Sequence, residues 1–223
     1  MVVNSLILLM LRINLVLLTL LLSSCILIGA NMSKIEQPEY TLIKTYTDAI
    51  ETRVYAPMLI AEVEVSGESR KRAISAGFQV IARYIFGDNI AQGKIAMTSP
   101  VQQQQSQKIA MTSPVQQQLS AEKADKSTWK VSFVMPSKFS LDTIPKPNND
   151  KIKLIEVPEK RYIVLRFSGL MSESNLNKHI DKLRQFVKTH HLSTQGEIKY
   201  AFYNPPWTLP FLRRNEVMLP LVD

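Results

Sequence analysis

The stretch Glu68–Phe86, ESRKRAISAGFQVIARYIF, decides the fold of this 223-residue chain. Four of its apolar residues follow the spacing i, i+4, i+7 and i+11: Ile74, Phe78, Ile81 and Ile85. This spacing places them on one stripe of an amphipathic helix. Ser66-Gly67 breaks the chain before the helix, and Gly87-Asp88-Asn89 ends it.

A second stretch, Ser172–Thr189, repeats this pattern in the later part of the chain. It follows another Ser-Gly pair, Ser168-Gly169. Its apolar residues have the same spacing: Leu176, Ile180, Leu183 and Val187. The sequence therefore predicts two similar halves, each built around one helix.

The segments that flank both helices have the composition of β-strands. They are rich in Val, Ile, Tyr and Thr, and several alternate between polar and apolar residues. In the first half they are Tyr40–Thr47, Glu51–Val65, Lys94–Gln102 and Trp129–Met135, and in the second Lys151–Glu156, Arg161–Phe167, Tyr200–Tyr203 and Glu216–Leu219. We predict an α+β fold from two strand-strand-helix-strand-strand halves, about 40–136 and 151–220, with a cleft at the seam.

A tandem repeat interrupts the first half. Lys94–Gln107 and Lys108–Ala121 agree at 12 of 14 positions, and each begins KIAMTSPVQQQ. The copies could pair as a hairpin, or one could join the sheet while the other bulges outward. The sequence leaves open which copy occupies the sheet.

Composition excludes several classes of protein and of site. A chain with 45% hydrophobic and 21% charged residues has material for one sizeable core, which excludes a disordered or collagen-like chain. Only 7 glycines and 1 cysteine argue against a glycine-rich nucleotide site and a cysteine-held metal cluster. The net charge of +8 favours anionic ligands, with a merely basic surface as the alternative. Neither a catalytic motif nor a nucleic-acid stacking platform is found.

The first thirty residues are typical of an export signal. An apolar run of about ten residues after Arg12 has the length of a signal-peptide core and is too short to span a bilayer as a helix. The true start is either Met1 or Met10, since Met10-Leu11-Arg12 would supply a basic beginning. We interpret residues 1–24 as a signal peptide.

Leu22-Ser23-Ser24-Cys25 resembles the bacterial lipobox, in which the cysteine thiol takes a diacylglycerol. Cys25 is the only cysteine of the chain and so has no internal disulfide partner. We expect a lipidated Cys25, a tether over residues 25–39 and a domain over 40–223. The protein would then be an exported lipoprotein of the bacterial envelope, facing the periplasm, on the inner or outer membrane. The alternatives are an uncleaved anchor, Leu6–Ala30, and a misread coding sequence.

A few residues outside the predicted core are candidates for ligand contacts. His179 lies at the edge of the second helix's apolar stripe, as a boundary histidine or as a metal ligand. Arg83 lies opposite Ile74, as a solvated side chain or as the partner of a carboxylate. Trp207 and Phe211 lie in a proline-rich segment that either packs in the core or forms a ligand wall.

Four motifs together resemble the SOUL haem-binding protein family. They are KIAMTSPV at 94–101, WKVSFVMP at 129–136, FSG at 167–169 and the long YNPPWTLPFLRRNEV at 203–217. The resemblance runs from about Tyr40 to Leu219. It implies a distorted antiparallel β-barrel of two repeated halves with one helix each, related to bacterial effector-binding domains.

The resemblance also implies non-covalent binding of haem or a related tetrapyrrole along the first helix and the C-terminal loop. Carried over by position, the helix would offer Phe78, Ala82 and Arg83, and the loop Leu209 and Phe211. This chain has no histidine before His179, so the axial ligand proposed for family members is missing.

From these observations we predict a monomeric, non-catalytic tetrapyrrole carrier or scavenger, attached to a membrane through its lipid and with no nucleic-acid partner. Three alternatives remain at this stage: an envelope module without ligand, a small-effector-binding domain, and an enzyme acting on tetrapyrroles.

Overall fold

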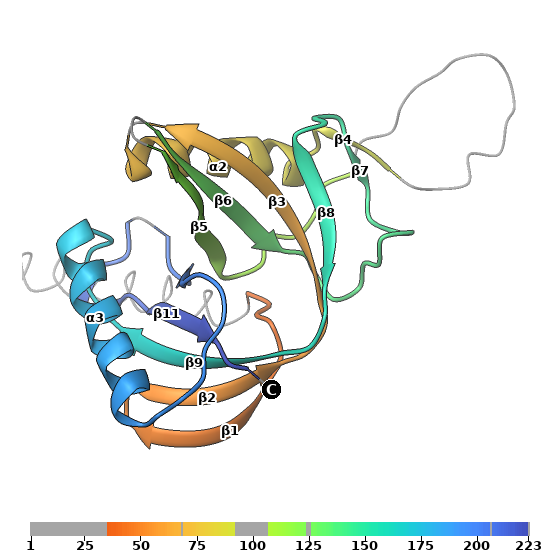
Figure 1. Cartoon of the computed structure of the whole chain (residues 1–223). Helices are drawn as coiled ribbons and strands as arrows, with labels where there is room; N and C mark the ends of the chain where they lie inside the picture. Colours follow the sequence, from red (N-terminus) through yellow and green to blue (C-terminus); the bar gives the residue numbers. More distant parts are fainter. Residues whose placement is uncertain (1–34, 68, 92–106, 124–125, 206, 223) are drawn as a thin grey trace, which may run out of the picture. The chain divides into compact units, whose positions relative to one another are not determined.

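The computed structural model describes residues 35–67, 69–91, 107–123, 126–205 and 207–222 (Figure 1). Residues from Glu36 to Asp223 form one compact unit, which begins four residues before the expected Tyr40. The predicted signal peptide, Cys25 and the predicted strand Lys94–Gln102 in the first copy of the repeat lie outside the described residues.

The order of elements follows the predicted duplication. The first half contains β1 (Tyr40–Thr47), β2 (Ile50–Tyr55), β3 (Met58–Gly67), α2 (Arg70–Ile85), β4 (Asn89–Ile90), β5 (Val115–Lys123) and β6 (Lys126–Val134). After β7 (Lys146–Pro147), the second half contains β8 (Ile152–Val157), β9 (Lys160–Phe167), α3 (Glu173–Thr189), β10 (Lys199–Phe202), the 3-10 turn η1 (Pro210–Leu212) and β11 (Asn215–Pro220).

Nine of these strands form one sheet in the order β1-β2-β9-β11-β10-β5-β6-β3-β8, and β4 pairs with β7 separately. The halves exchange strands, because β2 pairs with β9 of the second half while β8 pairs with β3 of the first. The pairing of β10 with β5 joins the two parts of the sheet at its middle. The prediction of an α+β fold with an antiparallel sheet and two helices is therefore confirmed.

The expectation of a barrel is wrong in one respect, since the sheet stays open. Strands β1 and β8 are its two edges. The chain crosses between the two parts through two short links, Ala56-Pro57 after β2 and Pro158-Glu159 after β8. Each link contains a proline, which has no N–H to donate to a neighbouring strand. The chain therefore passes from one part to the other at these links without extending the hydrogen-bonded sheet.

The second copy of the tandem repeat supplies the strand that the sequence left undecided. Val115 at the end of its KIAMTSPV begins β5, which pairs with β6 and β10. The buried side chain of Asn89 fixes the entry to this copy, because its amide donates to the Gln107 carbonyl at 2.7 Å and its oxygen accepts from the Gln107 N–H at 2.9 Å. Ile109 then packs into the core under α2.

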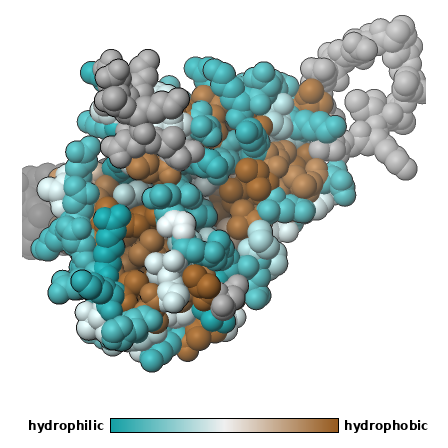
Figure 2. Space-filling model, in the orientation of Figure 1, coloured by the Kyte–Doolittle hydropathy of each residue, from teal (hydrophilic) through white to brown (hydrophobic). Residues whose placement is uncertain are grey.

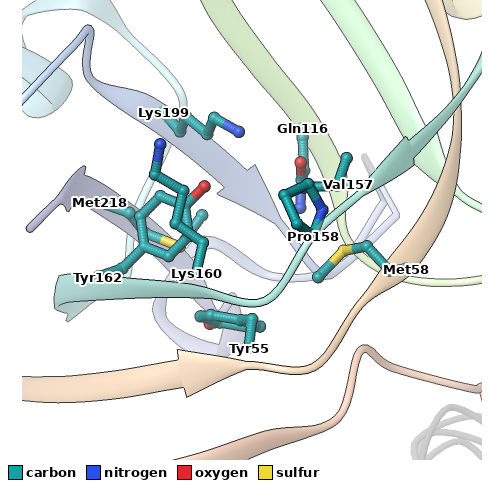
Figure 3. A pocket seen from close by; sticks show the side chains of 9 residues that line it. All are labelled: Tyr55, Met58, Gln116, Val157, Pro158, Lys160, Tyr162, Lys199 and Met218. Carbon is teal, nitrogen blue, oxygen red and sulfur yellow. The ribbon is translucent and has the colours of Figure 1, made fainter. Parts of the chain in front are cut away.

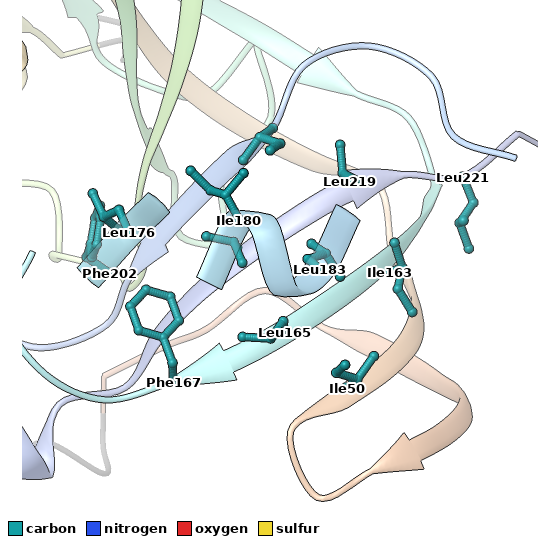
Figure 4. Close-up of a cluster of buried hydrophobic side chains, with 12 residues drawn as sticks. Ile50, Ile163, Leu165, Phe167, Leu176, Ile180, Leu183, Phe202, Leu219 and Leu221 are labelled. Carbon is teal, nitrogen blue, oxygen red and sulfur yellow. The ribbon is translucent and has the colours of Figure 1, made fainter. Parts of the chain in front are cut away.

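Helix α3 buries the stripe that the sequence predicted. Leu176, Ile180 and Leu183 pack with β9 and β11 in a hydrophobic cluster (Figure 4). Ser172 caps the helix by accepting the Asn175 N–H. None of the helices in the described ranges has the length and apolar character needed to cross a membrane.

Helix α2 is rotated relative to the prediction. Ile81 and Ile85 are buried as expected, but Phe78 is 39% exposed and Ile74 is only partly buried. Ala73 and Gly77 face the sheet in their place. The physical reason is close packing: a Cβ at Gly77 would lie 2.7 Å from Cγ2 of Val131, so the helix approaches the sheet through its smallest residues.

Gly77→Ala therefore tests the helix contact. In an exposed helix interior this change stabilises by about 1 kcal/mol. Here we expect a net loss of about 1–2 kcal/mol, because the new methyl overpacks the buried Val131. Urea unfolding followed by circular dichroism measures it, with the exposed Ser75→Ala of the same helix as the control. Equal or greater stability of Gly77→Ala would contradict the contact.

Candidate functional site

The space between the two parts of the sheet is filled. Tyr55, Tyr162, Val164, Ala201 and Met218 form a buried cluster there. The cavity beside it, which Lys160 and Lys199 also line, measures only ≈ 20 Å³ (Figure 3). That is room for about one water molecule. The cleft expected at the seam is therefore too small for an organic ligand.

A buried network of charges lies on the same face of the sheet. The carboxylate of Glu216, which is 0% exposed, accepts from Arg53 at 3.0 Å, from Arg214 at 2.8 Å and from the Tyr203 hydroxyl at 2.8 Å. Arg53 also pairs with Glu51 at 2.7 Å. Two arginines thus neutralise two carboxylates in the interior, and no net charge is left to attract a ligand.

This environment changes the pKa values of the participating groups. Burial works to lower the pKa of Arg53, but the charge of Glu216 and the bonds to Tyr55 and Glu51 outweigh it and raise that pKa. Burial, followed by the charge of Glu216, raises the pKa of Tyr55 to about 12 and that of Tyr203 well above its usual value. Arg53 consequently stays protonated, and Tyr55 and Tyr203 stay neutral, across the physiological pH range.

The opposite face of the sheet carries an open groove between α2 and α3. Phe202, Val115 and Phe133 are register partners across β10, β5 and β6, so their side chains share that face. Phe202 belongs to the cluster under α3, while Phe133 and Val115 belong to the cluster under α2. Together they form a row of apolar side chains between the two helices.

Arg70, at the start of α2, reaches over this floor. Its guanidinium carbon lies 5.2 Å from the ring centroid of Tyr200, 5.6 Å from that of Trp129 and 5.9 Å from that of Phe202. One terminal nitrogen donates to the side chain of Gln117 at 2.6 Å, whereas the buried Nε has no hydrogen-bond partner. Burial lowers the pKa of Arg70, partly offset by the charges of Tyr200 and Glu173. An added anion would therefore be stabilised here.

A hollow of ≈ 390 Å³ continues from this floor toward α3. Its lining combines aromatic, aliphatic and charged side chains: Leu119, Trp129, Asn177, Ile180, Asp181, Arg184, Glu197, Ile198 and Tyr200. Pockets for organic ligands commonly measure about 300–1,000 Å³. The lining comes from α3, β5, β6, β10 and the residues just before β10, so this hollow, unlike the interior cavity, has room for an organic ligand.

The loop from Tyr203 to Arg214 starts directly after Phe202, at the end of the apolar row. The Arg214 N–H donates to Asn204 at 2.6 Å, and the Arg213 side chain donates to the Thr208 carbonyl at 2.7 Å. Gly169 donates its N–H to the Pro210 carbonyl at 2.9 Å, which ties the loop to the turn before α3. These bonds give the loop a defined shape.

The apolar side chains of this loop point into solvent. Trp207 is 76% exposed, Leu209 56%, Phe211 71% and Leu212 63%. The interpretation of Trp207 and Phe211 as core residues is therefore wrong. Leu209 caps the 3-10 turn η1 and Phe211 lies within it, so both belong to one turn of the loop.

The three candidates on α2 lie on different sides of the helix. Phe78 packs on Phe133 with ring centroids 5.3 Å apart, so it borders the apolar row. Ala82 is partly buried and about 40° further round the helix, while the exposed Arg83 is about 140° from Phe78. Phe78 lies over β6, and the loop starts at the end of β10. These two strands are two positions apart in the sheet, so about 10 Å separates them.

His179 stands on the α3 side of the groove. Its ring stacks on Phe167 with centroids 4.1 Å apart, and its Nδ1 lies 2.7 Å from the Asn175 carbonyl oxygen. A proton on Nδ1 would leave Nε2 as the free acceptor. Among the described residues, His, Cys, Asp and Glu form no group of three or more that could hold a metal ion.

Sequence reasoning missed the two residues with the most unusual surroundings. Arg70 lies on the same side of α2 as Gly77. A prediction that turned the Gly77 side of the helix toward the sheet would also have placed Arg70 there. Glu216 stands in a strand whose other residues are almost all apolar, NEVMLP, and a charge in such a strand needs a buried partner. A glutamate in an otherwise apolar strand can be recognised from the sequence alone.

Comparisons with known proteins place this geometry in context. The family model described as SOUL heme-binding protein matches residues 35–220. Heme-binding protein 1 of Xenopus tropicalis is 25% identical over 169 residues, covering 76% of this chain and 82% of the relative. Heme-binding protein 1 of Xenopus laevis is 26% identical over 169 residues and also covers 76% of this chain and 82% of the relative.

Two solved structures share the fold at low sequence identity. The EcmrR C-terminal domain matches with a TM-score of 0.50 and 11% identity, covering 82% of this chain and 98% of that one. A protein described as a hydrolase encoded by lin2189 from Listeria innocua matches with a TM-score of 0.51 and 15% identity, covering 78% and 92%.

The buried network predicts a large cost for Glu216→Gln. The change leaves Arg53 and Arg214 without their shared counter-charge, and breaking a buried pair costs about 3–5 kcal/mol. Glu62→Gln is the control, because its pair with Lys130 is 3.6 Å long and partly exposed and should cost below about 1 kcal/mol. Chemical unfolding of both variants measures the difference, and similar losses would contradict a special role for Glu216.

The raised pKa of Tyr55 predicts a loss of stability at alkaline pH. A tyrosine ionises near pH 10 in the unfolded chain and near 12 in the fold. Its stabilising contribution, about 2–3 kcal/mol, is present below pH 10 and disappears as the pH rises toward 12. The free energy of unfolding should therefore fall between pH 10 and pH 12. In Tyr55→Phe it should fall less steeply over the same interval. An unchanged slope in Tyr55→Phe would assign the effect to other groups.

Proposed function

We propose, since the chain belongs to the SOUL heme-binding protein family, that it binds haem or another tetrapyrrole non-covalently in the groove between α2 and α3. The observation that carries this proposal is the apolar and aromatic floor of the groove with Arg70 above it. The interior cavity of ≈ 20 Å³ could not hold such a ligand.

In this arrangement the flat face of the porphyrin would rest on the apolar row that includes Phe202 and Phe133. Phe78 would border it from α2, and Leu209 and Phe211 from the loop. Burial of apolar surface contributes about 25 cal/mol per Å², so the ring faces supply most of the affinity. A propionate carboxylate would accept from Arg70, whose Nε has no other partner.

Iron coordination has no part in this binding mode. His179 stacks on Phe167 of β9, whereas Phe133 lies on β6. The three strands β11, β10 and β5 lie between β9 and β6. Haem and metal-free protoporphyrin are therefore expected to bind with similar affinity. The protein acts as a carrier or scavenger and performs no chemistry on the ligand.

We further propose that the carrier is exported and held at the bacterial envelope through Cys25. The sequence supports this placement with a signal-peptide pattern over residues 1–24 and a lipobox-like Leu22-Ser23-Ser24-Cys25. Cys25→Ser in the full chain should move the protein from the membrane fraction to the soluble fraction. Retention in the membrane fraction would favour the uncleaved anchor, Leu6–Ala30.

A titration of the Glu36–Asp223 unit tests the binding mode. Ferric haem and metal-free protoporphyrin are added separately, and Soret absorbance and tryptophan quenching are followed. We expect saturable binding of both, weakened about tenfold by Arg70→Gln and by Phe211→Ala. Thermal unfolding of each variant checks that the fold is intact.

Arg83→Gln and His179→Ala are the matched controls, and both should bind like the wild type. A loss in Arg83→Gln with none in Arg70→Gln would place the ligand on the outer face of α2. Haem-specific binding that disappears in His179→Ala would mean that iron is coordinated. If neither porphyrin binds saturably, the proposal fails.

A further inference from the structure

An exposed apolar surface lies at one corner of the domain. It is formed by two turns that the hydrogen bond from Gly169 to Pro210 holds together. We name it the apolar corner, and its residues are Leu170, Met171, Trp207, Leu209, Phe211 and Leu212. Six of the fourteen large hydrophobic side chains that are exposed in the described part of the chain gather here. On the face that Figure 2 shows, hydrophobic patches lie among hydrophilic residues.

The composition of the apolar corner fits a lipid surface. Tryptophan, phenylalanine and leucine are the residues with which peripheral proteins enter the headgroup region of a bilayer. Trp207 and Phe211 stand out from a loop that hydrogen bonds keep in shape, so little conformational entropy would be lost on insertion.

The start of the domain lies beside the same corner. The Gln37 side chain accepts from Arg214 at 3.1 Å, at the end of the loop. The Glu36 carbonyl accepts from the Ser113 N–H at 3.0 Å, and the Ser113 hydroxyl donates to the Tyr203 carbonyl at 3.2 Å, at the start of the loop. The chain that precedes Glu36 therefore leaves the domain next to the base of the loop.

The short chain between Cys25 and Glu36 limits the distance between the domain and the membrane. Ten residues separate Cys25 from Glu36, and fully extended they span at most about 36 Å. A tether of this length is short enough to hold the domain close to the membrane surface. This step rests on the lipidated Cys25 of the proposed function.

We propose that the apolar corner docks on the surface of a phospholipid bilayer. Docking would turn the loop end of the groove between α2 and α3 toward the lipid. Leu209 and Phe211 would then border both the groove and the membrane, so that an apolar tetrapyrrole passes between them without crossing water.

The test uses the Glu36–Asp223 unit, which contains the whole sheet and every hydrophobic cluster of the described chain and so folds without the anchor. Vesicles of phosphatidylcholine and phosphatidylglycerol are mixed with it and floated on a density gradient. In Trp129→Phe, Trp207 is the only tryptophan left, and its fluorescence should shift to the blue and be quenched by brominated lipid.

Leu170→Glu and Leu212→Glu should each weaken vesicle binding at least about tenfold. The matched control is Leu42→Glu on β1, which places the same charge at a leucine of similar exposure, 50% against 55% for Leu170, and should float like the wild type. Absence of wild-type flotation, or equal loss in all three variants, would overturn the proposal. So would a dimer in gel filtration that Leu170→Glu dissociates while no vesicles are bound.

Porphyrin titration in vesicle-free buffer separates this proposal from the proposed function. Leu170→Glu lies outside the groove and should keep the wild-type porphyrin affinity. A protein that binds porphyrin but never floats would refute the docking and leave the carrier function intact. One that floats but binds no porphyrin would refute the carrier function and leave the docking intact.

Discussion

The carboxylate of Glu216 is the interaction on which the rest of the structure depends. It lies on β11 and accepts from Arg53 of β2, from Arg214 and from Tyr203 at the two ends of the loop. The first of these bonds joins a strand of the first half to a strand of the second. The other two close the base of the loop. One buried charge therefore fixes both the exchange of strands and the position of the exposed side chains that follow from it.

The same network decides where a ligand can bind. A buried carboxylate in an open cleft would attract a cation, but here two arginines and a tyrosine satisfy it, and aromatic and methionine side chains fill the remaining space. The likeness to the EcmrR C-terminal domain is thus one of fold, because the central region is occupied by the protein's own side chains. The larger hollow lies on the opposite face of the sheet, beside α3, and this is the face on which we propose that the ligand binds.

The sequence was sufficient for the parts of the fold that repeat. Equal spacing in two helices, equal Ser-Gly breaks and strand-like flanks gave the duplication, because local periodicity directly reflects which face is buried. It was insufficient for the rotation of α2, since the close approach at Gly77 depends on Val131 from a distant strand. The open sheet likewise depends on long-range pairing. Among the site residues, Phe78, Leu209 and Phe211 came from family resemblance, while Arg70 required the aromatic floor to be seen beneath it.

The two proposed surfaces of the molecule are coupled through a single loop. Its base is held by Glu216 in the interior, its middle by Gly169 at the start of the second helix, and its apolar residues face outward. A loop fixed at these points cannot bury its apolar side chains in the domain's own core, so their hydrophobic free energy is available only to an external partner. The porphyrin proposed for the groove and the bilayer proposed for the corner would be two such partners, and they would meet at Leu209 and Phe211. The geometry therefore favours a ligand that is itself exchanged with a membrane, since only such a ligand uses both surfaces in one path.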